Sequence, residues 1–457
     1  MDESSGRIGM DALTKKNMVI VHYIMGIPPL RGGGLIKYAI DLAEMQNKLG
    51  QKTYILYAGE FRRRKENCIH RRKVINGVEY YEIINPLPVS ISSGMCSADL
   101  FMQSGNEKIY DDFLQNKHVN ILHIHSLMGL HVELINAAKK IGVKTIFTSH
   151  DYFGICPKAD LLYKNKICTQ PTGENCNICC PTPYSYNKLV RKQSHWFEWC
   201  LKRKLLVEIY EKLTEKKINN IDSRHAICDT NYKVLLQYYK NMFEKIDLFH
   251  YNSSVAKEQY EKYFGKKNSI VLGVMHQGIQ DKRKIRRCNG KLHFGFLGGT
   301  ELHKGYELLT RAVKEVQEEY SDRFVLDIYT KQTINAQCIA NHGVYTYNQI
   351  DDIFEKMDVL IAPSVCAETY GFVVLEALAH GRPVIISKNV GAKDLLEKFP
   401  GSGLIINATA EQLKETLRDL IENPKKIDQM NRYICGMQIN IDYKEYVSKV
   451  EQMYAMI

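Results

Sequence analysis

Two glutamates, Glu368 and Glu376, stand eight positions apart in ETYGFVVLEALAHGRPVI, a stretch that otherwise reads as buried core. A strand is expected before this stretch, and an apolar helix is expected to begin after Gly371 and to end at Gly381 and Pro383. Glu368 then lies in the loop before the helix, and Glu376 lies about a turn and a half into it. Both carboxylates are placed near the carboxyl edge of a parallel sheet, where open α/β folds bind their ligands.

Carboxylates in these positions suit a ligand that carries both phosphate and hydroxyl groups. Backbone N–H groups at the start of the helix can hold a phosphate. They come from Thr369, Tyr370, Gly371 and Phe372. A carboxylate one turn into the helix can accept hydrogen bonds from two ribose hydroxyls, and one in the preceding loop can meet a sugar. The spacing alone also allows a simpler interpretation, in which Glu376 faces solvent and Glu368 only favours the helix N-terminus.

Alternating strand and helix patterns place this stretch in the second of two similar units. The first unit begins with the buried strand MVIVHYIM, a loop containing Gly32, Gly33 and Gly34, and a helix that stops at Gly50. The second unit begins at KLHFGFLGG and repeats the alternation through PVIIS. Such alternation predicts parallel sheets and an α/β fold.

The chain divides accordingly into five segments. A flexible N-terminus is expected at 1–17, a first Rossmann-like domain at 18–278 with a cysteine-rich insertion at 156–180, and a basic linker at 279–290. A second Rossmann-like domain follows at 291–440, and a C-terminal helix at 441–457 is a candidate for crossing back to the first domain.

The stretch PSVCAETYGFVVLEALAHGRPVI strongly resembles the glutamate-seven-glutamate signature of glycosyltransferase family 4, the retaining group 1 glycosyltransferases of GT-B fold. The resemblance extends over nearly the whole chain. It includes the glycine loop, LHIHS from Leu122, TSHDYFGICP from Thr148, HQGI from His276 and FGFLGGTELHKG from Phe294. It implies two doubly wound domains that face a central cleft.

The resemblance also implies roles for individual residues. Glu368 resembles the residue that contacts the donor sugar, Glu376 the one that binds the ribose, and Lys304 the cation that neutralises the donor diphosphate. Where many members have glycine followed by arginine before that lysine, this chain has Gly298 and Gly299, so one diphosphate cation is missing or comes from elsewhere.

The implied reaction is transfer of a sugar, with retention, from a nucleotide-diphosphate sugar to a glycan or lipid-linked acceptor in polysaccharide or glycoconjugate synthesis. The missing arginine keeps open an inactive sugar-nucleotide-binding partner subunit, and the fold keeps open a nucleotide-sugar epimerase. Turnover of the donor to free nucleotide distinguishes these classes.

Two histidines are candidates for the acceptor side of the cleft. His125 and His150 each follow a strand of the first domain, at the edge that would face the second. In the family such positions lie near the reacting carbon, and His150 with Asp151 is the stronger candidate. A lone histidine at a strand end is otherwise a hydrogen-bonded structural residue.

The cysteine-rich insertion is a candidate metal site. Cys176 and Cys179 have the spacing of half a zinc knuckle, and Cys156 with Cys168 could complete four thiolates. We expect any such zinc to be structural, because the family's sugar transfer requires no cofactor. Reduced, buried thiols are the alternative for a chain without an export signal.

The net charge of +11 favours an anionic partner. Basic residues gather at 62–73, at 188–217 and at 282–287, and a helix expected at 187–217 carries Trp196 and Trp199. A basic helix with aromatic residues suits an anionic membrane surface, although a helix that packs its aromatics inward would have the same composition. No nucleic-acid-binding module is recognisable.

The location expected from these patterns is the cytoplasm, with peripheral attachment to the inner face of the cell membrane. The N-terminal residues lack the basic and apolar regions of a secretory signal, and no apolar run approaches the ~20 residues of a spanning helix.

Overall fold

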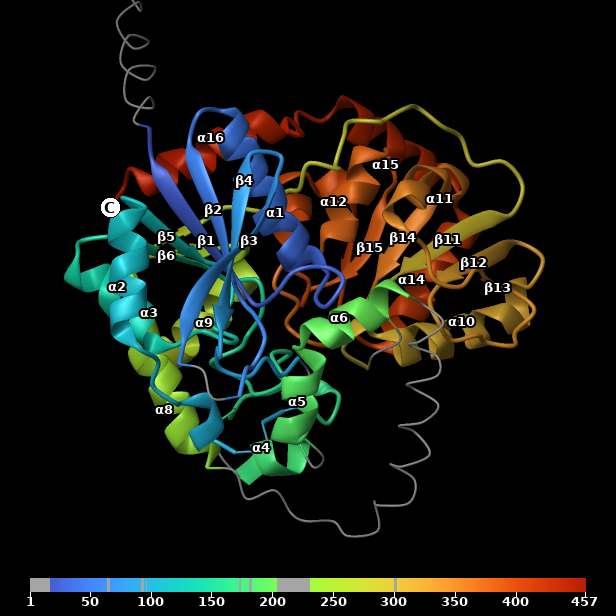
Figure 1. The fold of residues 1–457 in the computed structure, drawn as a ribbon. Helices are drawn as coiled ribbons and strands as arrows, with labels where there is room; N and C mark the ends of the chain where they lie inside the picture. Colours follow the sequence, from blue (N-terminus) through green and yellow to red (C-terminus); the bar gives the residue numbers. More distant parts are fainter. Residues whose placement is uncertain are drawn as a thin grey trace, which may run out of the picture.

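The computed structural model describes residues 17–63, 66–91, 94–95, 97–171, 174–180, 183–203, 231–299 and 302–457. Two α/β units, each built on a largely parallel sheet, lie side by side (Figure 1). The predicted flexible segment at 1–17 falls almost entirely outside the described residues.

The first sheet has eight strands in the order β10-β9-β6-β5-β1-β2-β4-β3. Its strands are β1 (Val19–Ile24), β2 (Lys52–Ala58), β3 (Cys68–Ile75), β4 (Val78–Ile84), β5 (Ile121–Ile124), β6 (Lys144–Thr148), β9 (Leu248–Tyr251) and β10 (Ser269–Val271). The inner strands are buried along most of their length because helices cover both faces. Its helices are α1 (Gly34–Lys48), α2 (Glu107–Asn116), α3 (Val132–Lys140), α8 (Tyr232–Phe243) and α9 (Ser254–Phe264).

The edge strand β3 is antiparallel to β4 and mostly exposed. Asn76 and Gly77 form the turn between them, and both have positive φ, as a tight hairpin requires. The basic run predicted at 62–73 lies partly on this strand, and two of its arginines there are paired. Arg71 contacts Glu79 at 2.9 Å, and Arg72 contacts Glu82 at 3.2 Å.

The second sheet has six parallel strands in the order β13-β12-β11-β14-β15-β16. They are β11 (Leu292–Leu297), β12 (Phe324–Tyr329), β13 (Ile339–Asn341), β14 (Val359–Ala362), β15 (Val384–Ser387) and β16 (Gly403–Ile406). The strand order reverses between β11 and β14, where a crevice opens at the carboxyl ends of parallel strands. The helices are α10 (Tyr306–Tyr320), α11 (Ile350–Lys356), α12 (Phe372–Ala379), α13 (Lys393–Lys398), α14 (Ala410–Glu422) and α15 (Lys425–Gly436).

The last helix, α16 (Tyr443–Tyr454), lies against α1 of the first domain (Figure 1). The hydroxyls of Tyr446 and Tyr38 are 2.9 Å apart, and Gln46 Nε2 donates to the Tyr454 hydroxyl at 3.2 Å. Apolar side chains of α16 join a hydrophobic cluster that also includes Leu375 of the second domain. The C-terminal helix therefore contributes to the core of the first domain.

The basic segment 279–290 has no regular secondary structure and runs along the second domain. Lys284 Nζ donates to Glu355 of α11 at 2.8 Å, and Arg283 donates to the carbonyl of Met437 at 2.7 Å. These cations are held by the protein itself, so the segment is a fixed connection.

The insertion of the first domain contains the short strands β7 (Leu162–Tyr163) and β8 (Lys166–Ile167) and the helix α4 (Glu174–Cys179), and the helices α5 (Tyr186–Lys192) and α6 (His195–Lys202) follow it. The single helix predicted from Asn187 is wrong over its described part. It breaks where the Ser194 side chain accepts a hydrogen bond from Phe197 N and caps α6. Residues 204–217 lie outside the described part of the chain.

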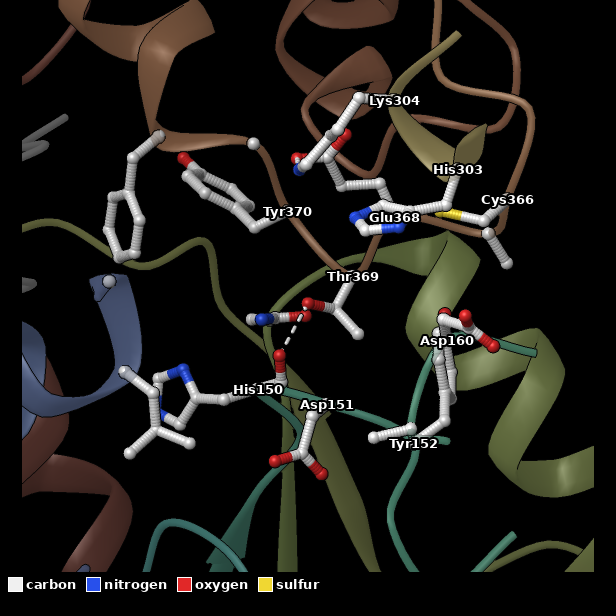
Figure 2. Close-up of a pocket in the computed structure, with 17 residues that line it drawn as sticks. His150, Asp151, Tyr152, Asp160, His303, Lys304, Cys366, Glu368, Thr369 and Tyr370 are labelled. Carbon is white, nitrogen blue, oxygen red and sulfur yellow. Dashed lines mark hydrogen bonds and ion pairs between the residues drawn. The ribbon is translucent and has the colours of Figure 1, made fainter. Parts of the chain in front are cut away.

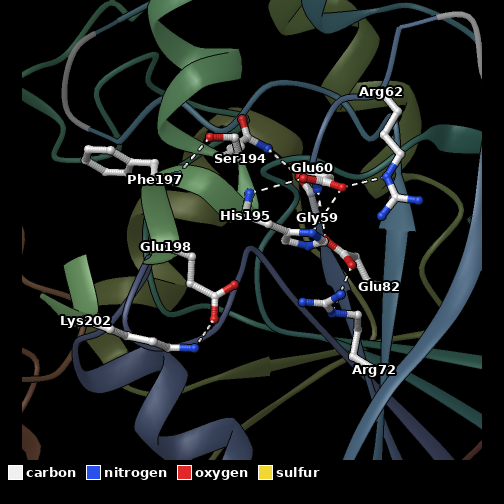
Figure 3. Close-up of polar contacts among 11 residues, drawn as sticks. Gly59, Glu60, Arg62, Arg72, Glu82, Ser194, His195, Phe197, Glu198 and Lys202 are labelled. Atoms are coloured by element: carbon white, nitrogen blue, oxygen red, sulfur yellow. Dashed lines mark hydrogen bonds and ion pairs between the residues drawn. The ribbon is translucent and has the colours of Figure 1, made fainter. Parts of the chain in front are cut away.

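A bridging histidine fastens α6 to the first sheet (Figure 3). His195 Nδ1 lies 3.0 Å from Glu60, and His195 Nε2 lies 2.6 Å from Glu82. With its inner side held in this way, α6 presents Trp196 and Trp199 outward, with 55% and 45% of their surfaces exposed. The interpretation in which both tryptophans pack inward is therefore wrong.

Within the described residues, no helix combines the length and the apolar character needed to cross a membrane.

Candidate active site

A cavity of about 300 Å³ lies between the two domains (Figure 2). The first domain contributes Gly34, Leu35, His150, Asp151, Tyr152, Ala159, Asp160 and Asn252. The second contributes His303, Lys304, Cys366, Ala367, Glu368, Thr369, Tyr370, Gly371 and Phe372. The carboxyl ends of strands from both sheets thus meet at one site, as the two-domain prediction requires.

Glu368 and Lys304 form an ion pair in this cavity, with Lys304 Nζ 2.6 Å from Glu368 Oε1. Ser364 donates to the other carboxylate oxygen. Burial alone would raise the pKa of the Glu368 carboxyl, but the Lys304 charge and these hydrogen bonds hold the pKa below its usual value. Among the described cavity residues, Lys304 is the one with a permanent positive charge.

The start of α12 forms the wall next to Glu368. Gly371 precedes the helix with φ 97°, a conformation that suits glycine. Thr369 connects the two domains, since its hydroxyl donates to the carbonyl of His150 at 2.9 Å and its own carbonyl accepts from Ser253 at 2.5 Å. These contacts fix the helix N-terminus relative to the first domain.

The glycine loop faces this same helix from the first domain. Gly33 precedes α1 with φ 103°, and Gly34 is the first residue of α1. A Cβ on Gly34 would lie 2.9 Å from the ring of Phe372, so glycine is needed there for the close approach of the domains. Gly32 has open space around it, and Gly298 follows β11 without lining the cavity.

Glu376 lies one turn beyond the cavity wall and does not line the cavity. It is 7% exposed, and its Oε1 accepts a hydrogen bond from His276 Nε2 at 3.0 Å. The rings of Phe372 and Tyr347 both pack near His276, each with its centroid 5.2 Å from that of His276. The alternative in which Glu376 faces solvent is therefore wrong.

The two predicted histidines have different positions. His150 lines the cavity, whereas His125 is fully buried behind it. His125 Nδ1 lies 3.2 Å from His150 Nε2. The prediction that His125 lines the cleft is wrong, because its side chain is buried and both of its ring nitrogens contact other histidines.

Besides Glu368, two acidic side chains line the cavity, and the site prediction included one of them and missed the other. Burial raises the pKa of Asp151 to about 6, although its oxygens accept hydrogen bonds from Phe153 N and the Ser126 hydroxyl. Asp151 was expected at the site together with His150, and it lines the cavity. Asp160 comes from the cysteine-rich insertion, and no sequence signal connects it to the site.

The four predicted thiolates of the insertion do not come close enough together to share a metal ion in the described structure. Cys156 Sγ lies 3.8 Å from Asp160, and Cys179 Sγ lies 3.7 Å from Lys158 Nζ and 3.5 Å from the carbonyl of Leu162. Among the described residues, three histidines are close enough together to share a metal ion. None of the four predicted cysteines belongs to such a group there. The structure does not form the four-thiolate site, and a zinc content of about one per chain stays a prediction for elemental analysis.

The match to a known protein family lies mainly in the second domain. Residues 279–435 match the family model described as glycosyl transferases group 1. The second domain is a group 1 glycosyltransferase domain. This match includes Lys304, Glu368 and Glu376, and it makes glycosyl transfer the reaction class that the family supports.

Two relatives extend the comparison along the chain. One is an uncharacterized 42.6 kDa protein in the cps region of Klebsiella pneumoniae, 23% identical over 343 residues, which are 74% of this chain and 72% of that protein. The other is a phosphatidyl-myo-inositol mannosyltransferase of Propionibacterium freudenreichii, 28% identical over 226 residues, which are 47% of this chain and 58% of that protein.

Solved structures confirm the GT-B fold that the group 1 signature implies. Sucrose-phosphate synthase from Thermosynechococcus elongatus superposes with a TM-score of 0.59 at 11% identity, covering 96% of this chain and 98% of the other. Anabaena HepE in complex with UDP and glucose superposes with a TM-score of 0.57 at 11% identity, covering 96% and 100%.

Proposed function

We propose that this protein is a retaining glycosyltransferase that moves a sugar from a nucleotide-diphosphate donor to a glycan or lipid-linked acceptor. The observation that carries the proposal is the Lys304–Glu368 pair at the N-terminus of α12, in a cavity between the two domains. A cation beside unpaired backbone donors suits a diphosphate, and charge that develops on a leaving diphosphate is stabilised there.

Each domain has a part in this reaction. The donor nucleotide lies on the second domain, with its ribose near Glu376, its diphosphate near Lys304 and its sugar near Glu368. The acceptor approaches from the side of His150 and Asp151. A UDP-glucose complex of the structurally similar Anabaena HepE supports a nucleotide sugar as the ligand class.

The donor can be identified by thermal shift with UDP-, GDP- and ADP-sugars. Turnover of that donor then distinguishes the candidate functions. A transferase forms free nucleotide and a glycosylated acceptor, an inactive binding subunit forms neither, and an epimerase leaves the nucleotide intact with an altered sugar. Absence of binding to every nucleotide sugar would contradict the proposal.

Substitution of Lys304 tests the diphosphate site. We expect Lys304→Ala to weaken donor binding at least about tenfold, because a hydrogen bond to a charged group contributes about 1.5–3 kcal/mol. Lys331→Ala, an exposed lysine after β12, is the matched control. Unchanged donor affinity of Lys304→Ala in calorimetry would place the diphosphate elsewhere.

A lipid-linked acceptor at the cytoplasmic face of the membrane is favoured by the outer face of α6. Trp196 and Trp199 are exposed there, and the Arg203 guanidinium stacks on the Trp199 ring at 4.2 Å. Exposed aromatic rings beside cations suit the boundary of an anionic bilayer. The cps-region relative and the mannosyltransferase relative are compatible with polysaccharide or glycolipid synthesis.

A further inference from the structure

A group of buried histidines to which the proposed reaction gives no role lies behind His150 of the cavity. Five histidines meet at the carboxyl half of the first sheet: His22, His123, His125, His150 and His250. All except His150 are fully buried. Hydrogen bonds connect these histidines in one continuous series, which we call the hydrogen-bond chain. The donor and the acceptor of each bond can be derived by starting from one end of this hydrogen-bond chain.

That end is the carbonyl of Leu272, which can only accept a hydrogen bond. His250 Nε2 lies 2.7 Å from it and is therefore protonated, which leaves His250 Nδ1 as an acceptor in a neutral ring. The Thr148 hydroxyl, 3.0 Å away, must donate to this Nδ1. The Thr148 oxygen in turn accepts from His123 Nε2 at 2.6 Å, so His123 Nδ1 is the acceptor for the Tyr454 hydroxyl at 2.8 Å.

The same direction continues from α16 to the cavity. Because the Tyr454 hydroxyl donates its hydrogen bond to His123, the Tyr454 oxygen accepts one from Gln46 Nε2 at 3.2 Å. This orientation turns Gln46 Oε1 toward His22 Nε2, 2.8 Å away, which must donate. His22 Nδ1 then accepts from His125 Nε2 at 3.0 Å, and His125 Nδ1 accepts from His150 Nε2 at 3.2 Å.

The derivation needs neutral rings, and burial provides them. It lowers the pKa of His22 and of His250 to about 4 and that of His150 to about 3. Burial, together with the neighbouring histidines, also holds the pKa values of His123 and His125 well below the ordinary value. Each ring therefore has one donor and one acceptor at neutral pH.

We propose that this hydrogen-bond chain holds His150 with Nε2 protonated, so that Nδ1 meets the cavity as an acceptor for a substrate hydroxyl, and that Tyr454 and Gln46 are positioning residues for it. In the described part of the chain, His150 Nδ1 has no hydrogen-bond partner of its own, and His150 lines the cavity (Figure 2). The C-terminal helix α16 thereby influences the tautomer of His150 through the Tyr454 hydroxyl.

The three histidines that could share a metal ion do not require one. They are His22, His123 and His125. His22 Nδ1 and His125 Nε2 are bonded to each other, and both nitrogens of His123 are bonded to hydroxyls. A metal ion would have to replace these bonds, so the hydrogen-bond chain accounts for the cluster without it.

Nitrogen NMR of protein labelled with ¹⁵N-histidine tests the tautomer directly and needs no substrate. We expect the His150 signals, assigned by their loss in His150→Gln, to show a protonated Nε2 and an unprotonated Nδ1 at pH 7.5. A proton on Nδ1 of His150 would overturn the proposal. So would one equivalent of tightly bound metal in the wild-type protein that is lost in His123→Gln.

Two variants of α16 test the positioning role. Tyr454→Phe removes the hydroxyl that donates to His123 and accepts from Gln46 in the hydrogen-bond chain. Tyr446→Phe removes a buried hydroxyl of the same helix that bonds Tyr38 and is not part of the hydrogen-bond chain. Both delete one buried hydroxyl, so similar losses of stability are expected. We expect Tyr454→Phe alone to give mixed tautomers at His150 and to lower kcat about tenfold, the effect of one misplaced hydrogen bond.

The rate effect rests on the proposed function, whereas the tautomer does not. If His150 has the expected tautomer but no nucleotide sugar is turned over, the proposed function fails and the tautomer assignment stands. If Tyr454→Phe leaves the His150 signals unchanged, or if both variants change them equally, the positioning role is overturned.

Discussion

The carboxylate of Glu368 lines the cavity and contacts both Lys304 and Ser364, so it is the side chain to which the proposed reaction assigns contact with the donor sugar. We expect Glu368→Ala to lower kcat by about 10²–10³, the usual effect of removing one fixed group from a transition state, with a smaller change in donor affinity. Steady-state kinetics against donor concentration measures this. Glu397→Ala on α13, with an exposed carboxylate, is the control. A wild-type kcat in Glu368→Ala would remove the sugar-contacting role.

Glu376 is assigned to nucleotide binding, so its substitution should weaken nucleotide affinity more than it lowers kcat. Its carboxylate is already held by His276, so its position is defined before the ribose binds. We expect Glu376→Ala to raise the dissociation constant of the free nucleoside diphosphate about 10- to 100-fold, because hydrogen bonds to a charged acceptor are lost. Calorimetry with the nucleotide alone measures this. An effect confined to turnover would contradict the assignment.

At the scale of the element, α6 combines an anchored inner side with an aromatic outer side. His195 holds it to Glu60 and Glu82, so changing the tryptophans should leave the helix in place. We expect Trp196→Ala with Trp199→Ala to reduce flotation with anionic liposomes several-fold at low ionic strength, because buried aromatic area is lost from the interface. Salt should release the wild-type protein.

Tyr433→Ala is the control for the liposome experiment, since this residue of α15 is 41% exposed on the second domain. Equal flotation of the double variant and the control would leave a water-soluble acceptor as the better interpretation. The basic run at 62–73 is a weaker target than its sequence predicts. Arg62, for example, already contacts Glu60 at 2.5 Å.

At the scale of the whole molecule, the buried histidines make stability depend on acid. The unfolded chain binds a proton at each histidine below about pH 6.5, whereas folded His22 and His250 do so only near pH 4. The free energy of unfolding should therefore fall as the pH drops from 6.5 to 4, by about 1.4 kcal/mol per pH unit for each buried histidine. Between pH 8 and 7 these residues contribute no such slope.

Thermal unfolding at pH 7.5, 6.5 and 5.5 measures this dependence. We expect the midpoint to fall steeply only below pH 6.5, and His250→Gln to show a shallower fall because it lacks one of the titrating groups. A midpoint that is equal at pH 7.5 and 5.5 would contradict the expected net uptake of protons on unfolding.

Much of the fold was predictable from local patterns. The strand, glycine loop and helix at the start of each domain follow from apolar runs and helix stop signals, which depend on nearby residues alone. Glu368 and the start of α12 were predictable near the cavity because parallel strands bring their carboxyl ends to one edge, whereas Gly34 and Lys304 were expected there from the family resemblance. The long helix at 187–217 failed at Ser194, where a side-chain cap outweighs helical periodicity.

Local patterns were sufficient to locate the central strands of both sheets and the residues at their carboxyl edges, because the period of apolar residues and the turn chemistry depend on neighbouring residues. How residues far apart in the chain meet followed only from the packed structure. His125 is buried rather than exposed in the cleft, Asp160 reaches the cavity from the insertion, and Tyr454 bonds His123 across 331 positions of sequence. Such contacts depend on how the sheets, the insertion and the last helix pack together, and no local pattern carries that information.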